Sequence, residues 1–298
     1  MDGMDEAATP AATAAHNREL VDTYREAFSS FDPDRYGPFL AEDPVYHAGM
    51  TMRRGRAAVH ANTGAGRVLY PFGALRSTTR RVVAQGDWVA ELIEREAITN
   101  ADAHYENVYA MFYEVRDDRV ATQVELLDFR VAADKFDLTA LGPPADPGVQ
   151  RVPTQIAAPP AADDHSPPAE AIRTVIGFLD AFLSFDPDRF LDRLVADPLH
   201  QVGMTHRSGR EAFLAMAAAG RVLYPDGIAQ RTHHVIVSNG TTVATLCSLR
   251  ARTHIGIDYE NLYGMFVDVH EGRVAALVEV YDTRVGDAAF DLSVLTTL

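Results

Sequence analysis

The chain has 298 residues, a formal net charge of −15 and 47% hydrophobic residues, so it is long and apolar enough to bury a substantial core. An acidic surface repels phosphate backbones and anionic lipid, so we expect neither nucleic acid nor membrane as a partner. The single cysteine, Cys247, excludes an intramolecular disulfide and a cysteine-based zinc or cluster site.

The N-terminal segment, residues 1–16, is rich in Ala and Thr and carries acidic residues. It lacks the basic patch followed by an apolar run that marks a signal peptide. No stretch of the chain approaches the ~18 apolar residues that span a bilayer. We therefore expect a disordered N-terminus and a cytoplasmic protein.

Helices are predicted in the next part of the chain. Over residues 17–30 apolar side chains recur at a helical spacing: Leu20, Val21, Tyr24, Ala27 and Phe28. Asp32 and Pro33 favour the start of a second helix, which runs to about residue 41, because Asp caps a helix and Pro suits its first turn. Residues 44–48 predict a short strand, and residues 55–68 a third helix that Pro71 ends.

Four longer segments with strand character follow. Residues 77–84 lead through a Gln-Gly-Asp turn into residues 88–99, and residues 105–115 lead through an Arg-Asp-Asp turn into residues 119–131. Both connections have the composition of hairpin turns. Helices followed by a meander of antiparallel strands predict an α+β fold in which a curved sheet covers the helices.

The whole pattern then occurs a second time. Phe31-Asp32-Pro33-Asp34-Arg35 recurs 154 residues further on, and the same offset aligns residues 31–141 with the second half of the chain without a gap. Identity over this span is roughly 45%, and the period is far longer than that of a solenoid repeat. We therefore predict two copies of one domain, over residues 17–141 and 170–298.

Residues 142–169, between the copies, are rich in Pro, Ala and Asp. Three Pro-Pro pairs favour extended conformations and exclude a helix interior, so we interpret this segment as an exposed linker. It is long enough for the two domains to dock side by side as an intrachain pseudo-dimer.

The pattern Tyr-Glu-Asn-x-Tyr-x-Met-Phe, followed after a turn by Val-Glu-x-x-Asp, spans residues 105–128 and again residues 259–282. It resembles the last two strands of SnoaL-like and phenazine-biosynthesis condensing proteins, relatives of ketosteroid isomerase and limonene epoxide hydrolase in the nuclear transport factor 2-like superfamily. The resemblance covers nearly all of both copies. It implies cone-shaped domains, each with about three N-terminal helices packed in a curved antiparallel sheet, that hold a small apolar molecule without a cofactor.

The resemblance specifies the reaction only weakly, because this fold hosts isomerases, dehydratases, cyclases, hydrolases and non-catalytic binders. The base of ketosteroid isomerase would fall at Tyr46 and His200, neither of which is a carboxylate. Its oxyanion tyrosine would fall at Tyr24, and the second copy lacks it. Steroid isomerisation is therefore not expected. The glutamate that resembles the acid–base group of the phenazine condensing proteins is present twice, as Glu125 and Glu279.

Glu125 and Glu279 are the first candidates for catalysis. Each lies in the middle of a predicted strand, and burial in an apolar cone would raise the pKa of the carboxyl and suit it to acid–base chemistry near neutral pH. The alternative is a glutamate at a sheet edge or a domain interface. Asp128 and Asp282 follow three residues later, on the opposite face by strict alternation, so a cap at the strand end competes with a catalytic role.

One strand face carries aromatic and amide side chains in both copies: Tyr105, Asn107 and Tyr109, and Tyr259, Asn261 and Tyr263. Such a face suits a pocket for an apolar ligand with polar groups, and ordinary core packing is the alternative. Tyr24 and Tyr46 are further candidates for substrate binding. His200 is a candidate catalytic residue in the first strand of the second copy. His47 lies in the equivalent strand of the first copy but aligns with Gln201, and adjacent positions on a strand face opposite ways. At most one register therefore points a histidine inward in each copy.

We expect a cofactor-free enzyme of specialised, polyketide- or terpenoid-type metabolism. It would perform cyclisation, condensation, isomerisation, dehydration or epoxide opening on a small apolar molecule. The alternatives are a carrier that binds without turnover and a structural pseudo-dimer module. No metal, nucleotide or flavin motif is present in the sequence. Whether one copy or both are active, and whether the chain forms a further homo-oligomer, is left open.

Overall fold

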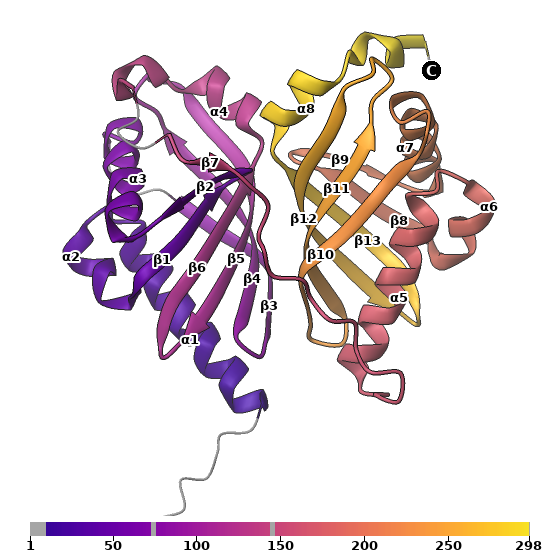
Figure 1. Ribbon diagram of the computed structural model, residues 1–298, viewed down its shortest axis with the longest axis horizontal. Coiled ribbons are helices and arrows are strands. Elements are labelled where there is room, and N and C mark those ends of the chain that lie inside the picture. Colours follow the sequence, from indigo (N-terminus) through magenta and orange to yellow (C-terminus); the bar gives the residue numbers. More distant parts are fainter. Residues whose placement is uncertain (1–9, 73–75, 144–146, 298) are drawn as a thin grey trace, which may run out of the picture.

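The computed structural model describes residues 10–72, 76–143 and 147–297. It consists of two domains of the same architecture. Each domain is a layer of helices against the concave face of one curved sheet, and the two sheets stand back to back (Figure 1). Within the described residues no helix combines the length and the apolar run that crossing a bilayer requires.

The first domain contains, in chain order, α1 (Pro10–Phe28), α2 (Pro33–Tyr36), η1 (Gly37–Phe39), β1 (Leu40–Ala48), β2 (Thr51–Arg54), α3 (Arg56–Leu69), β3 (Arg76–Gln85), β4 (Trp88–Ile98), β5 (His104–Arg116), β6 (Arg119–Leu127), α4 (Phe129–Lys135) and η2 (Leu138–Leu141). The second domain repeats this order with α5 (Pro167–Phe182), α6 (Pro187–Phe190), η3 (Leu191–Arg193), β8 (Leu194–Val202), β9 (Thr205–Ser208), α7 (Arg210–Leu223), β10 (Ile228–Ser238), β11 (Thr242–Arg252), β12 (Asp258–His270), β13 (Arg273–Tyr281), α8 (Thr283–Ala289) and η4 (Leu292–Thr297).

The two sheets share one strand order, β3-β4-β5-β6-β1-β2 in the first domain and β10-β11-β12-β13-β8-β9 in the second. The predicted α+β fold, its duplication and the docking of the copies are confirmed. The sheets are nevertheless mixed, whereas the prediction was an antiparallel sheet. β1 runs parallel to β6, and β8 runs parallel to β13; in each pair both strands begin at the same end of the sheet.

Some predicted element boundaries differ from the structure. α1 begins at Pro10, because proline suits a first turn and the Ala-rich residues 11–15 favour a helix. The described part of the predicted disordered N-terminus is therefore helical, and residues 1–9 lie outside the described residues. β6 ends at Leu127 and gives way to α4, which the prediction missed along with α8, β2 and β9.

The predicted linker, residues 142–169, is exposed along most of its length but contacts both domains. Within it, β7 (Val149–Gln150) pairs with β2 at the edge of the first sheet. The backbone N–H of Ala157 donates to the carbonyl of His233 in the second domain at 2.9 Å. α5 begins at Pro167, so the last proline pair starts a helix and does not extend the linker.

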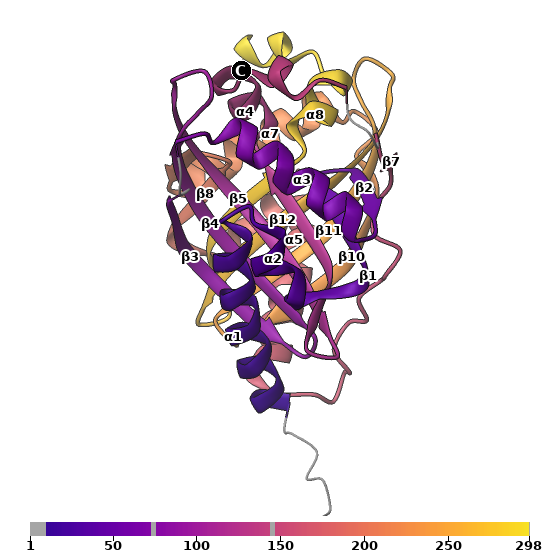
Figure 2. The same ribbon diagram turned by 90° about the vertical axis from the view of Figure 1, so that its left-hand side faces the viewer.

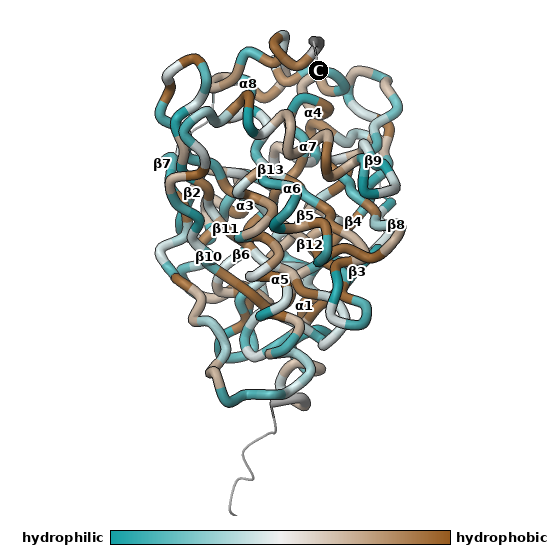
Figure 3. Tube along the Cα trace, turned by 90° about the vertical axis from the view of Figure 1, so that its right-hand side faces the viewer, coloured by the Kyte–Doolittle hydropathy of each residue, from teal (hydrophilic) through white to brown (hydrophobic). Residues whose placement is uncertain are grey.

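Three apolar cores hold the molecule together. One fills the space between the helices and the concave face of the first sheet, which we call the first cone, and one fills the equivalent second cone. The third lies between the two convex faces. Figure 2 shows α1, α2 and α3 in front of the first sheet, and Figure 3 shows hydrophobic residues along α5 and hydrophilic residues in the turns at the narrow end.

The two sheets approach closely where Ala110 faces Gly264, which are equivalent positions of the two copies. A Cβ placed on Gly264 would lie 2.6 Å from the Cβ of Ala110, well inside van der Waals contact. Phe112 and Phe266, also equivalent, face each other with ring centroids 6.0 Å apart. The pseudo-two-fold axis therefore passes close to these pairs, and the contact requires a glycine on one side.

Gly264→Ala is expected to lower the free energy of unfolding by about 1–3 kcal/mol, because the added methyl group overpacks the interface. The double variant Ala110→Gly/Gly264→Ala should recover most of this loss, since it moves the methyl group across the pseudo-two-fold axis. Urea unfolding of the wild type and the two variants measures both effects. A single variant as stable as the wild type, or a double variant less stable than the single one, would contradict the close contact.

Candidate functional site

Charged and polar side chains lie on the concave face of the first sheet, inside the first cone. β4 contributes Glu91 and Arg95, and β6 contributes Gln123 and Glu125. Met111 on β5 belongs to the core of this cone and pairs with Glu91 on one side and Glu125 on the other. The two carboxylates therefore flank Met111 at one level of the sheet.

Glu125 is accessible to solvent although it lies on the concave face. Of its side-chain surface, 14% is exposed, which a fully packed interior would not leave. Burial raises the pKa of its carboxyl, and the positive charge of Arg95 opposes this shift. Glu125 thus combines partial solvent exposure with a carboxyl group whose pKa is raised above its ordinary value.

Arg95 lies deep in the same cone, with 7% of its surface exposed. Its Nη1 is 3.9 Å from the Oε2 of Glu125, which is an ion-pair distance and too long for a hydrogen bond. Its guanidinium carbon lies 4.2 Å from the ring centroid of Tyr109, a cation–π contact. Within the described part of the chain, its Nε has no hydrogen-bond partner.

Tyr24 and Tyr46, both predicted to bind substrate, line the first cone. The hydroxyl of Tyr24 donates to the Oε1 of Gln123 at 2.6 Å, which fixes the amide and leaves its Nε2 without a partner among the described residues. Tyr46 pairs with Gln123 across β1 and β6, and burial together with the nearby Glu125 raises the pKa of its hydroxyl. Tyr46 therefore stays a proton donor at neutral pH.

Asn107 was predicted to line the pocket, but its polar atoms are used within the fold. Its Nδ2 donates to the hydroxyl of Tyr105 at 3.0 Å and to the carbonyl of Asp128 at 2.9 Å, and its Oδ1 accepts from the Val108 N–H. The Tyr105 hydroxyl in turn shares a hydrogen bond with that of Tyr109. Asn107 and Tyr105 therefore tie β5 to the end of β6. Of the three hydrogen-bonded residues, Tyr109 is the one that contacts Arg95.

Glu91 is almost fully buried, with 1% of its surface exposed. Its Oε2 lies 3.3 Å from the Nε of Arg25 on α1, an ion pair without hydrogen-bond geometry. Burial raises the pKa of the carboxyl to about 7, and the charge of Arg25 opposes this shift. Glu91 is a second carboxyl group with a raised pKa in the same cone, and it is almost completely shielded from solvent.

A cleft of about 840 Å³ opens beside α1 at the edge of the first cone. Its lining includes Arg25, which pairs with Glu91, and Tyr70, whose hydroxyl interacts with that of Tyr109. Arg35 and Arg67 lie on the same lining. The cleft therefore adjoins the polar groups of the first cone through Arg25 and Tyr70.

The second cone has a different interior. The Nε2 of His200 lies 2.8 Å from the Oε1 of Glu279, and both residues are buried, so the structure brings two predicted catalytic residues together. The rings of Phe182 and Phe213 pack against the His200 imidazole. Tyr259, Asn261 and Tyr263 repeat the hydrogen-bonded chain of the first copy, including a bond from Asn261 to the carbonyl of Asp282.

Most other polar groups of the first cone have no counterpart in the second. The residues equivalent to Tyr24, Arg25, Glu91, Arg95, Tyr113 and Gln123 are Phe178, Leu179, Thr245, Leu249, Val267 and Leu277. Five of these six replacements are apolar. The first cone is therefore the charged one, while the second holds a single histidine–glutamate pair in aromatic and aliphatic surroundings.

Asp128 and Asp282 lie outside both cones. Each is the N-cap of the helix after its strand, and its carboxylate accepts from the backbone N–H two residues on. The Oδ2 of Asp282 also accepts from the N–H of Met50 in the other domain at 3.0 Å, and the Oδ1 of Asp128 from the hydroxyl of Thr283 at 3.0 Å. Their positions correspond to the capping role weighed in the sequence, so we leave them out of the catalytic proposal.

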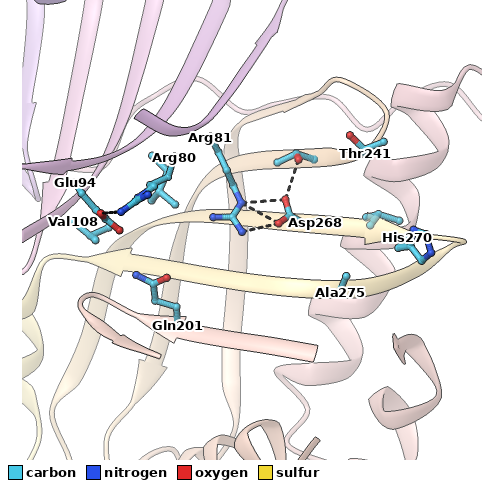
Figure 4. A pocket seen from close by; sticks show the side chains of 12 residues that line it. Arg80, Arg81, Glu94, Val108, Gln201, Thr241, Asp268, His270 and Ala275 are labelled. Carbon is cyan, nitrogen blue, oxygen red and sulfur yellow. Dashed lines mark hydrogen bonds and ion pairs between the residues drawn. The ribbon is translucent and has the colours of Figure 1, made fainter. Parts of the chain in front are cut away.

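A second cleft, of about 530 Å³, lies between the two domains and not in a cone. Figure 4 shows Arg81 from the first sheet and Asp268 from the second pointing at each other across it. The Nη2 of Arg81 donates to the Oδ2 of Asp268 at 2.6 Å, and its Nε to both carboxylate oxygens. This bidentate ion pair contributes to the docking of the domains.

Sequence reasoning missed Glu91, Arg95, Arg25 and Gln123. β4 carries charged residues on both faces, so its periodicity does not tell which of them point inward. The alignment of the two copies contained a signal that could have identified them. Glu91 and Arg95 align with Thr245 and Leu249 in an otherwise similar strand, so the charged residues are not required by the fold.

A family model described as the SnoaL-like domain matches residues 21–123. No curated protein matches the chain. Solved structures similar to it include a nuclear transport factor 2-like protein from Burkholderia xenovorans, at 19% identity and a TM-score of 0.35 over 41% of this chain and 96% of that one. They also include candidate polyketide cyclases from Xanthomonas campestris, at 20% and 0.36 over 41% and 98%, and from Pseudomonas putida, at 17% and 0.34 over 40% and 96%.

The matched segment runs from α1 into β6 and so falls within the first domain. The second domain repeats its order of helices and strands and the order of strands in its sheet. The first domain therefore contains a SnoaL-like domain, matched over residues 21–123, and the second domain repeats its architecture in tandem.

Proposed function

We propose that the chain is an acid–base enzyme that acts, without a cofactor, on a small apolar molecule in the first cone. The observation that carries the proposal is Glu125, a carboxylate on the concave face whose side chain remains 14% exposed while burial raises its pKa. Perturbed carboxyl groups that a small molecule can reach are typical of active sites.

In this proposal the carboxylate of Glu125 accepts a proton from a carbon next to a carbonyl group of the substrate. Its raised pKa brings it closer to the pH at which a base is both ionised and strong enough to act. The hydroxyl of Tyr46 lies in the same cone and is held protonated by burial, so it is suited to donate to substrate oxygen.

Returning the proton at another position would give isomerisation. Attack by the resulting carbanion within the same molecule or on a second one would give cyclisation or condensation. These reactions match the SnoaL-like family, whose domain the first copy carries. We therefore place the enzyme in specialised metabolism of the polyketide or terpenoid type.

The first cone is favoured over the second as the site of catalysis. Glu279 is hydrogen-bonded to His200, whereas among the residues that the structure describes the carboxylate of Glu125 has only the distant Arg95 as a partner. The other polar groups of the first cone are largely replaced by apolar residues in the second. We propose that the second domain is the scaffold that completes the pseudo-dimer.

The test is proton exchange at a carbon next to a carbonyl group, because this step is common to the reactions proposed. The full chain is incubated in D2O with 2-acetylnaphthalene, an apolar ketone, and NMR follows loss of the methyl proton signal. We expect exchange faster than in buffer alone, and inhibition by an excess of 2-ethylnaphthalene. Binding of the ketone without exchange would favour the carrier function, and neither binding nor exchange would favour a structural module.

A further inference from the structure

The first cone contains a buried arginine whose hydrogen-bonding capacity is largely unused. A guanidinium offers five N–H donors, and burying it without partners is costly. The Nε of Arg95 has no partner among the described residues, its nearest carboxylate oxygen is 3.9 Å from Nη1, and the ring of Tyr109 supports only its face. The edge of the guanidinium is therefore available to an acceptor that the described part of the chain does not provide.

A second donor in the same cone is in a similar state. The Nε2 of Gln123 has no partner within the described residues, because Tyr24 fixes the other end of the amide. Both Arg95 and Gln123 are more than nine-tenths buried. At these two positions the second copy has Leu249 and Leu277, so the fold itself does not need a polar group there.

We infer that the first cone recognises an apolar ring compound through a carbonyl oxygen that accepts a hydrogen bond from Arg95. This inference rests on the proposed function and names its substrate class. When Glu125 takes a proton from the carbon next to the carbonyl, the electron pair of the broken C–H bond moves to the oxygen and forms an enolate. Arg95 then faces the negative charge, and the proton on Glu125 removes the charge that had competed for the arginine.

Neutralising the charge of Glu125 does not by itself explain why Arg95 is buried in the first cone. At 3.9 Å the pair lacks a hydrogen bond, and a buried ion pair without one recovers little of the cost of burying its charges. A group placed only to neutralise Glu125 would approach it more closely. At this distance the guanidinium keeps donors that Glu125 does not use, which the carbonyl oxygen of a substrate would accept.

The test compares two ligands of nearly equal shape, 2-acetylnaphthalene and 2-ethylnaphthalene, which differ in the carbonyl oxygen. Their dissociation constants are measured by equilibrium dialysis for the wild-type chain, for Arg95→Leu, which introduces the residue of the second copy, and for Arg95→Lys. We expect the wild type to bind the ketone about tenfold more tightly than the hydrocarbon or better, since a charge-assisted hydrogen bond contributes at least that much.

In Arg95→Leu this preference should fall by about tenfold or more, while the affinity for 2-ethylnaphthalene is kept or improved. Arg95→Lys keeps the positive charge beside Glu125 but loses the planar donor edge, so its preference should fall by about three- to tenfold. If Arg95→Leu does not fold, Arg95→Lys decides. A wild type that binds both compounds equally or binds neither, or a preference unchanged in the variants, overturns the inference.

Binding does not depend on turnover, so the two proposals can fail separately. A ketone preference that depends on Arg95 in a chain without deuterium exchange supports the inference and removes the proposed function. Deuterium exchange that depends on Glu125, in a chain whose ketone preference survives Arg95→Leu, supports the proposed function and overturns the inference about Arg95. An arginine that serves only to stabilise the fold would lower the affinity for both ligands equally, and that result also overturns the inference.

Discussion

Glu125→Gln is expected to reduce the rate of deuterium exchange into 2-acetylnaphthalene by about 100- to 10,000-fold, the usual range for loss of a positioned general base. The same substitution at Glu279 should leave the rate within about threefold of the wild type, because that residue lies in the other cone and its carboxylate is hydrogen-bonded to His200. The two glutamates occupy equivalent positions, so each variant is the matched control for the other.

Glutamine has the shape of a protonated glutamate, so neither variant should lose the fold. Circular dichroism and equilibrium dialysis with 2-ethylnaphthalene verify that the fold and the apolar part of the site are retained. Equal losses in the two variants, or a larger loss in Glu279→Gln, would contradict the assignment of catalysis to the first cone.

Glu91 is expected to make the protein less stable as the pH rises from about 4.5 to about 7. Burial raises the pKa of its carboxyl from 4.5 to about 7, and Arg25 offsets this only in part. In that range the folded protein keeps a proton that the unfolded chain has released, so the free energy of unfolding falls as the pH rises. A change of this size corresponds to about 3 kcal/mol once the pH exceeds both values.

Glu91→Gln removes this titration, since the amide stays neutral. The difference between the free energies of unfolding at pH 5 and pH 8 should shrink by about 2–3 kcal/mol relative to the wild type. Urea unfolding at the two pH values measures it, and Glu96→Gln, a half-buried position on the same strand, controls for the loss of a negative charge. A Glu91→Gln protein with the pH dependence of the wild type would show that the buried carboxyl group is not the cause.

The sequence was sufficient for the fold because its signals are local and occur twice. The turn compositions predicted both hairpins of the first sheet, where Gly86, Asp117 and Asp118 adopt positive φ angles. The Asp-Pro pairs predicted helix starts, and Asp32 and Asp186 cap α2 and α6. The gapless repeat then required the second domain to have the same architecture as the first.

The site was less predictable because it depends on contacts between distant segments. Alternation placed Asn107 on the inward face, but the carbonyl that uses its amide belongs to Asp128 at the end of another strand. Arg95 and Glu91 stand on a strand with charged residues on both faces, and only the sheet register brings Glu91 level with Glu125. Residue type and spacing carry no information about which polar atoms remain unpaired.

The most direct measurement is a crystal structure of the chain soaked with 2-acetylnaphthalene. The account predicts ligand density in the first cone, with the ring system among the tyrosines, the acetyl oxygen within hydrogen-bond distance of Arg95 and the methyl carbon next to the carboxylate of Glu125. Density in the second cone alone, or a first cone filled by its own side chains with Arg95 bonded to the protein, would contradict it.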